Sequence, residues 1–267
     1  MGDKPNPKDP SLPPDYRAAF FTAYHTTNDL PTTADPATYA AAARQYAGRW
    51  AQWLPSEKNV PILDLGCGAG EFLHFLWGRG YHTLYGVDLN AEGLALGRTM
   101  GLPNLSEGNL ITYLVNHLAA ERPPFGLIAA LNVFEHLHKA EIITLLGLIR
   151  RALTPSGRLI AVTPNGLSPF GGATRYWDFT HETGFTPAAW RQLARLTGFS
   201  APIFEEYGAI PHSWRGRLRA LLWQLIKTGI TLYDRVEIGA PRDASRVYTA
   251  DMKIILSSRQ GSGADAL

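Results

Sequence analysis

The sequence has very little cysteine and little net charge. Its 267 residues include one cysteine, Cys67, so no intramolecular disulfide can form, and we expect a reducing, cytoplasmic environment. The formal net charge of +2 is too small to indicate a nucleic-acid partner. No group of Cys and His residues has the spacing of a structural zinc site, and we expect no bound metal.

Long apolar runs are missing as well. No stretch reaches the roughly 20 apolar residues of a membrane-spanning helix, and the N-terminus lacks the apolar core of a signal peptide. Hydrophobic residues make up 45% of the chain and charged residues 18%, an ordinary globular mixture. We expect one α/β domain over residues 16–258, between a disordered arm at 1–15 and a loose tail at 259–267.

The stretch from Val60 to Gly70, VPILDLGCGAG, organises the rest of the chain. An apolar run is followed by three glycines spaced by single residues, and a helical pattern follows at 71–78. Glycine has no Cβ, so the turn between strand and helix can approach a nucleotide closely. The amides that open the helix face the same ligand. The alternative is a glycine-rich loop that only turns the chain.

The position after the glycines separates two kinds of nucleotide. A dinucleotide fingerprint would have a third glycine at position 71, where this chain has Glu71. A negative side chain there opposes a pyrophosphate and suits a cationic ligand. The next apolar stretch, LYGVDL at 84–89, predicts a second buried strand that ends in Asp88. A carboxylate about 20 residues past the glycines can bond both hydroxyls of a ribose.

These motifs resemble those of class I S-adenosylmethionine-dependent methyltransferases, whose motif I has an acid followed by GxGxG. S-adenosylmethionine carries a sulfonium and no phosphate, in agreement with Glu71. The resemblance implies this cofactor, packing of Leu89 on the adenine, and contact of Asn109 with the adenine amino group. Asn109 can also cap the following helix. The expected cofactor-binding residues are Asp64, Gly66, Cys67, Gly68, Gly70, Asp88, Leu89, Asn109, Leu110 and Asn132.

Strands and helices alternate after residue 60, which predicts parallel strands with right-handed crossovers. Strands are expected at 60–65, 82–88, 104–107, 125–131, 157–163, 199–207 and 247–257. Helices are expected at 70–79, 91–100, 110–120, 138–153, 188–197 and 214–235. The resemblance implies an α/β, Rossmann-like, doubly wound sheet with strand order 3-2-1-4-5-7-6, the last strand antiparallel and helices on both faces.

Residues 16–54 are expected to form two helical pieces, broken near Pro31 and Pro36. The polar segment that contains Tyr24 and His25 precedes the second piece. It is either a surface loop or a lid over the cofactor, as in many members of the resembling family. As a lid, it would place Tyr24 and His25 on the substrate.

The sequence LNVFEHL at 131–137 follows the fourth strand, where the ligand crevice of an open parallel sheet lies. Asn132, Glu135 and His136 should therefore lie beside the reactive centre. His136 has a side chain that titrates near physiological pH, so it is a candidate general base. Alternatively, it only forms a hydrogen bond at the start of a helix.

The long segment at 163–185 opens onto the same crevice. Long loops in compact domains are uncommon unless functional, and we expect Asn165, Arg175 and Asp178 to bind the acceptor. His181 is the preferred base, ahead of His136, because Asp178 and Glu182 could orient its ring and raise its pKa. No spacing rule supports a Mg²⁺ site formed by Asp178, Glu182 and a histidine.

This segment also resembles methyltransferases of bacterial polysaccharide and cell-surface glycan biosynthesis, with a pattern close to PN, RYxDFTHE and FTP. That resemblance implies O-methylation of a hydroxyl on a sugar or glycan intermediate. One alternative is a methyltransferase for quinones, phenols or natural products, with an apolar acceptor pocket lined by the helix at 214–235. The other is a non-catalytic partner subunit that binds S-adenosylmethionine.

An insertion at 209–246 separates the last two strands. Its helix has an apolar face and carries Arg215, Arg217 and Arg219 near its start. The helix can pack on the domain, act as a lid or contact a membrane surface. The sequence does not indicate an oligomeric state.

Overall fold

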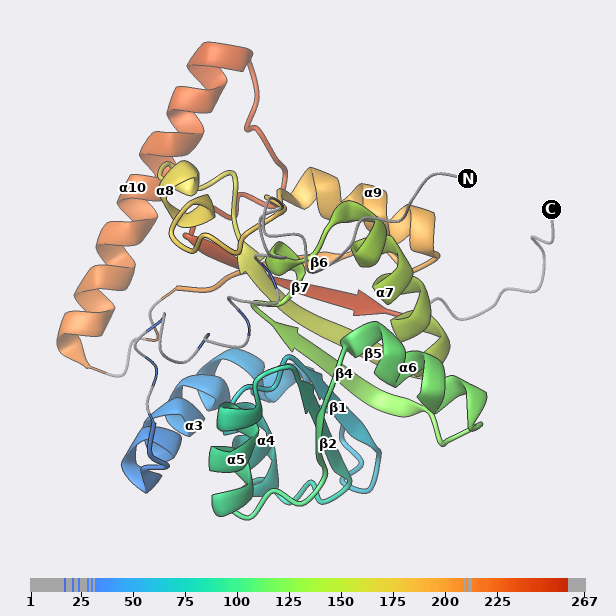
Figure 1. Ribbon diagram of the computed structural model, residues 1–267. Helices are drawn as coiled ribbons and strands as arrows, with labels where there is room; N and C mark the ends of the chain where they lie inside the picture. Colours follow the sequence, from blue (N-terminus) through green and yellow to red (C-terminus); the bar gives the residue numbers. More distant parts are fainter. Residues whose placement is uncertain are drawn as a thin grey trace, which may run out of the picture.

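The computed structural model describes Arg17, Phe21, Tyr24, Asn28, Leu30 and residues 32–208, 210 and 213–258. The predicted arm at 1–15, the tail at 259–267 and His25 lie outside the described residues. The described parts form one α/β layer structure around a single sheet (Figure 1).

A seven-stranded sheet with the order β3-β2-β1-β4-β5-β7-β6 lies at the centre, as predicted. Neighbouring strands among β1 to β5 run parallel, and β7 runs antiparallel to both β5 and β6. The strands are β1 (Ile62–Leu65), β2 (Leu84–Asp88), β3 (Leu105–Glu107), β4 (Phe125–Leu131), β5 (Leu153–Pro164), β6 (Ile203–Glu206) and β7 (Asp251–Ser257).

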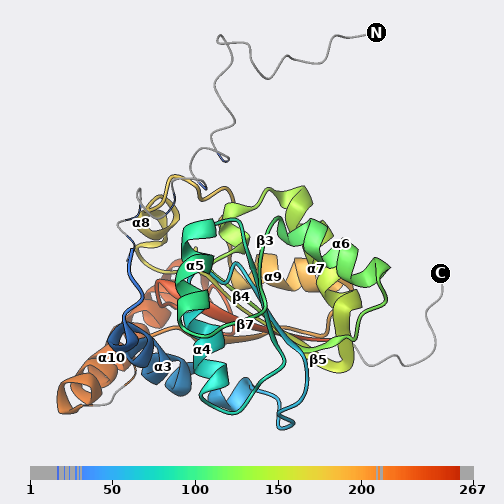
Figure 2. The ribbon, with the colours of Figure 1, turned by 60° about the horizontal axis from the view of Figure 1, so that its bottom comes forward.

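Helices cover both faces of this sheet (Figures 1 and 2). The helices α3 (Pro36–Trp50), α4 (Glu71–Trp77) and α5 (Ala91–Thr99) share one hydrophobic cluster with the sheet. A second cluster lies under α6 (Leu110–Ala119), α7 (Lys139–Ala152) and α9 (Pro187–Thr197). The other helices in the described residues are η1 (Ala51–Trp53), η2 (Phe134–His136), α8 (Gly171–Arg175) and α10 (Trp214–Ile238).

Local signals explain some element ends but not all. Helix α9 begins after Thr186, whose side chain accepts a hydrogen bond from the Ala189 amide, and ends at Gly198 with a φ of 77°. Strand β5 starts at Leu153, earlier than the predicted residue 157, because Leu153 pairs with Phe125; regular pairing with β4 resumes only at Arg158, which pairs with Leu127. The intervening residues 154–157 form an irregularity in this ladder, in agreement with their turn-forming Pro-Ser-Gly composition.

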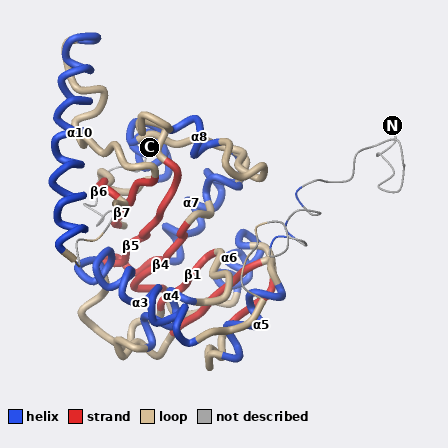
Figure 3. Tube along the Cα trace, turned by 90° about the vertical axis from the view of Figure 1, so that its left-hand side faces the viewer, coloured by secondary structure: helices blue, strands red, loops and turns tan. Residues whose placement is uncertain are grey.

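Helix α10 lies along the β6 edge of the sheet and projects beyond it (Figure 3). Within α10 only Thr231 and Asp234 are buried, and contacts such as the ion pair of Lys227 with Glu206 hold it to the domain. Its apolar residues stay exposed, including Trp214, Leu218, Leu221, Leu222, Leu225 and Ile226. No helix in the described part of the chain is long and apolar enough to cross a membrane.

The predicted acceptor-binding role of Asn165 is wrong. Its side chain is fully buried, and its amide nitrogen donates to the carbonyl oxygens of Val247 and Thr249 at 2.9 and 3.0 Å. Its side-chain oxygen accepts from the Leu167 amide at 3.0 Å. The two bonds to Val247 and Thr249 join the end of β5 to the segment before β7, and the bond from Leu167 fixes the turn after β5, so Asn165 stabilises the scaffold.

We predict that Asn165→Ala lowers the free energy of unfolding by about 2–4 kcal/mol, because it leaves buried backbone groups without partners. Denaturant titration of the full chain measures this loss. Asn116→Ala, at an exposed position on α6, is the matched control and should change stability by about 0.5 kcal/mol or less. Equal stability of the two variants would contradict the scaffold role.

Candidate active site

The glycine loop after β1 is shaped by two close approaches. Gly66 has a φ of +71°, and a Cβ there would lie 2.5 Å from Cγ2 of Val133, which follows β4. Only glycine fits this position without strain. Gly68 also has a positive φ, and a Cβ there would meet no atom within 4 Å. The loop is therefore closed towards β4 at Gly66 and open on the ligand side at Gly68.

Asp88, at the end of β2, is fixed by this loop. One carboxylate oxygen accepts from the Gly68 amide at 2.7 Å, and the other accepts from the Asn90 amide at 2.8 Å. A carboxylate oxygen can accept more than one hydrogen bond, so Asp88 keeps acceptor sites for the hydroxyls of a ribose. The next residue, Leu89, is 46% exposed and offers an apolar surface beside them.

A cavity of about 370 Å³ lies against these residues. Most of the predicted cofactor-binding residues line it, namely Gly66, Gly68, Asp88, Leu89, Asn109, Leu110 and Asn132. Asn132 has a φ of +57°, unusual for a residue other than glycine, at the carboxyl end of β4. Asn109 also caps α6 by accepting from the Ile111 and Thr112 amides, so its two expected roles are compatible.

Three predicted cofactor-binding residues do not line this cavity. Asp64 is buried within β1, and burial together with nearby Asp88 raises its pKa well above the usual range. The Cys67 thiol points into the hydrophobic cluster beneath α4, and burial raises its pKa too. Gly70 caps α4 with a φ of +78°. These residues support the loop. Neither the Asp64 nor the Cys67 side chain is among the groups that line the cavity.

Residues of the N-terminal segment cover one end of the cavity, where Arg17, Phe21 and Tyr24 contribute to the wall. Arg17 donates to both carboxylate oxygens of Glu141 at 3.2 and 3.0 Å, and to the backbone oxygen of His136 at 3.2 Å. The Tyr24 hydroxyl donates to Asp178 at 3.3 Å, and burial raises its pKa. This placement favours the lid over a separate surface loop.

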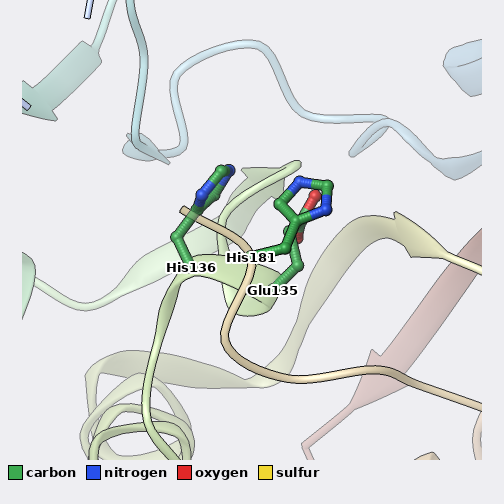
Figure 4. Close-up of side chains that lie close together, drawn as sticks. All are labelled: Glu135, His136 and His181. Atoms are coloured by element: carbon green, nitrogen blue, oxygen red, sulfur yellow. The ribbon is translucent and has the colours of Figure 1, made fainter. Parts of the chain in front are cut away.

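Glu135, His136 and His181 form a cluster at this end of the cavity (Figure 4). One potential ligand atom from each side chain lies within 4.8 Å of the others, and the two imidazole centroids are 4.9 Å apart. His136 also lines the cavity. The two histidines therefore come together from segments that are distant in the sequence.

Hydrogen bonds fix the protonation pattern of both rings. The Thr180 hydroxyl donates to Asp178 at 2.7 Å, so it accepts from Nδ1 of His136 at 2.8 Å. Nδ1 of His181 lies 3.1 Å from the carbonyl oxygen of Arg175, to which it donates. In the neutral rings, both Nε2 atoms therefore keep a lone pair. Burial and nearby His181 lower the pKa of His136 to about 4, so this ring is neutral at pH 7.

The expected orientation of His181 by two acids is wrong. Asp178 bonds to Thr180, behind His136, and the Glu182 carboxylate lies 3.4 Å from His138. The backbone explains this arrangement, because the amides of Glu182 and Thr183 both donate to the Glu135 carbonyl oxygen, at 2.7 and 3.0 Å. Sequence reasoning missed Thr180, for which the only signal was its place between Asp178 and His181.

Arg175 supports the same loop. Its guanidinium donates to the Glu182 carbonyl oxygen at 2.7 Å, and its own carbonyl oxygen accepts the hydrogen bond from Nδ1 of His181. Neither Arg175 nor Asp178 is among the residues of the cavity wall. Both hold the segment that carries His181.

Comparisons with known proteins agree with this geometry. A family model described as "Methyltransferase domain" matches residues 37–201. A SAM-dependent methyltransferase from Archaeoglobus fulgidus is similar in structure, with a TM-score of 0.59, 20% identity, and coverage of 88% of this chain and 97% of that chain. A comparison with curated proteins found no match.

Two further structures share the fold. An S-adenosylmethionine-dependent methyltransferase from Mesorhizobium loti has a TM-score of 0.54 at 15% identity, covering 82% of this chain and 99% of that chain. Magnesium protoporphyrin IX methyltransferase from Synechocystis, with bound SAM, has a TM-score of 0.51 at 14% identity, covering 72% and 89%. Such low identities show the fold, and the family model covers more than half of the chain. The protein is thus a member of the methyltransferase domain family.

Proposed function

We propose that this protein transfers a methyl group from S-adenosylmethionine to a hydroxyl oxygen, most specifically on a sugar or glycan intermediate. The observation that carries the proposal is one cavity with two differently built ends. One end has the open glycine loop and Asp88, and the other has His136 beside His181. The first end suits an adenosyl group, and the second suits a hydroxyl that must lose a proton.

The residues that line the cavity suit the parts of the cofactor. Asp88 would bind the ribose, and Leu89 and Leu110 would flank the adenine. The open space beside Gly68 would let the cofactor lie against the main chain. Glu71, also in the wall, offers a negative charge that suits a sulfonium. The cofactor supplies an activated methyl group when bound.

The chain's own groups then serve the acceptor. The hydroxyl oxygen forms a bond to the methyl carbon as the carbon–sulfur bond breaks and its electron pair stays on sulfur. The proton leaves the hydroxyl towards the Nε2 lone pairs of His136 and His181. The cavity walls, to which Tyr24 contributes, hold the oxygen in line with the methyl group, which is the protein's main contribution to the rate.

Exposed aromatic rings favour a sugar as the acceptor. Phe170, Tyr176, Trp177 and Phe179 are each at least 75% exposed on the segment that carries His181. Aromatic faces pack on the apolar faces of sugar rings, and polar groups nearby receive the hydroxyls. The rival pocket for an apolar small molecule was expected to use α10, but no α10 residue is among the described residues that line the cavity.

The direct test is a transfer assay with methyl-labelled cofactor against nucleotide sugars, oligosaccharides and phenols, with mass spectrometry of the product. We expect an O-methylated sugar. Methylated phenols without sugar products would support the small-molecule rival. Cofactor binding without any methylated product would support the non-catalytic partner subunit.

Asp88→Ala should weaken binding of S-adenosylhomocysteine by about 1.5–3 kcal/mol, the scale of a lost charge-assisted hydrogen bond. Isothermal titration calorimetry measures the difference. Glu57→Ala removes an exposed carboxylate ahead of β1, away from the crevice, and should bind like the unchanged protein. An Asp88→Ala variant that is folded and binds equally well would contradict the ribose assignment.

His181→Ala should lower single-turnover methyl transfer by roughly 10²–10⁴-fold, the scale of lost assistance to proton removal. His136→Ala should cost less, because its neutral, buried ring is the weaker base. Affinity for the cofactor should stay nearly unchanged in both. The control is His82→Ala, an exposed histidine next to Trp77. A His181→Ala rate equal to that control would remove His181 from the chemistry.

We also propose that α10 contacts a lipid surface. Its exposed apolar residues recur at helical spacing, and Arg215, Arg217 and Arg219 are exposed at its start. The first 20 residues of the helix contain no acid, so its charge complements anionic headgroups.

The full chain should therefore sediment with phosphatidylglycerol vesicles, and binding should weaken as salt rises. Replacing Leu221 and Leu225 together by Glu should abolish sedimentation, whereas Val115→Glu, an exposed apolar position on α6, should not. Unchanged sedimentation of the double variant contradicts lipid contact. A dimer that the double variant dissociates would instead assign this face to a second copy of the chain.

A further inference from the structure

We propose that Glu135, His136 and His181 bind a divalent cation of the first transition row at the acceptor end of the cavity. This cluster joins η2, after β4, with the segment after α8. Its catalytic role, described below, rests on the proposed function, whereas binding of the cation does not.

The spacing of the three side chains suits one ion. A potential ligand atom of each lies within 4.8 Å of the others. Ligand atoms that share a cation at about 2.1 Å lie at most about 4.2 Å apart. Small side-chain rotations therefore complete the site. Figure 4 shows the two rings side by side, with the Glu135 carboxylate next to the His181 ring.

Both histidines are already oriented as metal ligands usually are. Their Nδ1 atoms are occupied, one by Thr180 and the other by the Arg175 carbonyl oxygen, which leaves each Nε2 lone pair for a cation. The Thr180 hydroxyl in turn donates a hydrogen bond to the Asp178 carboxylate. Such outer partners fix the tautomer of a ligating imidazole and raise its basicity.

Glu135 supplies the independent observation. Its side chain is 1% exposed, and within the described part of the chain its Oε2 atom is buried without a hydrogen-bond partner. A buried carboxylate oxygen without a partner costs free energy, so such an atom needs an explanation. A cation between Glu135 and the histidines provides the missing partner.

The backbone holds the cluster together before any ion arrives. Both the Glu182 and Thr183 amides donate to the carbonyl oxygen of Glu135. The Thr183 hydroxyl donates to the Leu137 carbonyl oxygen at 2.9 Å. The two segments that carry the ligands are therefore joined on both sides of His136, and binding requires little reorganisation.

The donor set indicates the class of ion. Two imidazoles and one carboxylate suit Mn²⁺, Fe²⁺, Co²⁺ or Zn²⁺, whereas Mg²⁺ and Ca²⁺ prefer oxygen ligands alone. Three protein ligands leave coordination positions open, as in catalytic sites. His136 lines the cavity, so an open position can face the acceptor.

A cation here would assist the proposed reaction directly. A hydroxyl oxygen on the cation has a lowered pKa and releases its proton to solvent water. The resulting alkoxide forms the bond to the methyl carbon, and the carbon–sulfur bond breaks with its electron pair on sulfur. In the cation-bound protein the Nε2 lone pairs of the two histidines are ligands, so the proton passes to water instead of to the histidines.

The test uses the full chain without a polyhistidine tag, treated with a chelator and then titrated with MnCl₂. Calorimetry, and loss of the electron paramagnetic resonance signal of free Mn²⁺, should each report one bound ion. Glu135→Gln and His181→Ala should each weaken binding at least 10-fold, and Thr180→Val should weaken it about 10–100-fold. His82→Ala should bind normally. No binding at millimolar Mn²⁺, or equal affinity in all variants, overturns the proposal.

Transfer assays separate this inference from the proposed function. Loss of turnover in chelator with recovery on adding Mn²⁺ supports the cation. O-methylation at an equal rate in chelator overturns the catalytic role of the cation and leaves the proposed function standing. If the variants bind Mn²⁺ as expected but no O-methylated product forms with any acceptor, the cation site stands and the proposed O-methyltransferase function is overturned. Thermal melting confirms that Glu135→Gln, which keeps the side-chain shape, is folded.

Discussion

The close contact between Gly66 and Val133 is the constraint on which the site depends. It joins the carboxyl ends of β1 and β4, the neighbouring strands from which the chain continues to opposite sides of the sheet. A crevice opens at such a reversal. The glycine loop faces one side of it, and Asn132, Glu135 and His136 follow β4 on the other. Any side chain at position 66 would push the two halves apart.

The second requirement is that a distant segment returns to this crevice. His181 reaches it because the backbone after Asp178 is bonded to Glu135 and Leu137, and because Arg175 braces the Glu182 carbonyl oxygen. Two of these bonds join backbone to backbone and two join a side chain to a backbone oxygen, so the backbone that carries the His181 ring is held from several sides. The acceptor end of the cavity is thus assembled by hydrogen bonding, whereas the cofactor end is assembled by close packing of glycines.

The parts of this arrangement that follow from local patterns could be predicted. Gly66, Gly68 and Asp88 are local to two strand ends, and the alternation of strands and helices determined the sheet once the resemblance supplied its order. Asn165 and Thr180 could not be assigned, because their roles depend on partners that the sequence does not reveal. Cys67 shows a third limit, since a position within the motif did not tell on which side its thiol lies.

The central claim is that cofactor, acceptor hydroxyl and cation meet at one crevice. A crystal structure of the full chain with S-adenosylhomocysteine and Mn²⁺, with anomalous data for the metal, tests it most directly. The account predicts the ribose on Asp88, the sulfur directed towards His136, and an anomalous peak between Glu135, His136 and His181. An adenosyl group bound elsewhere, or a sulfur directed away from His136, would contradict it.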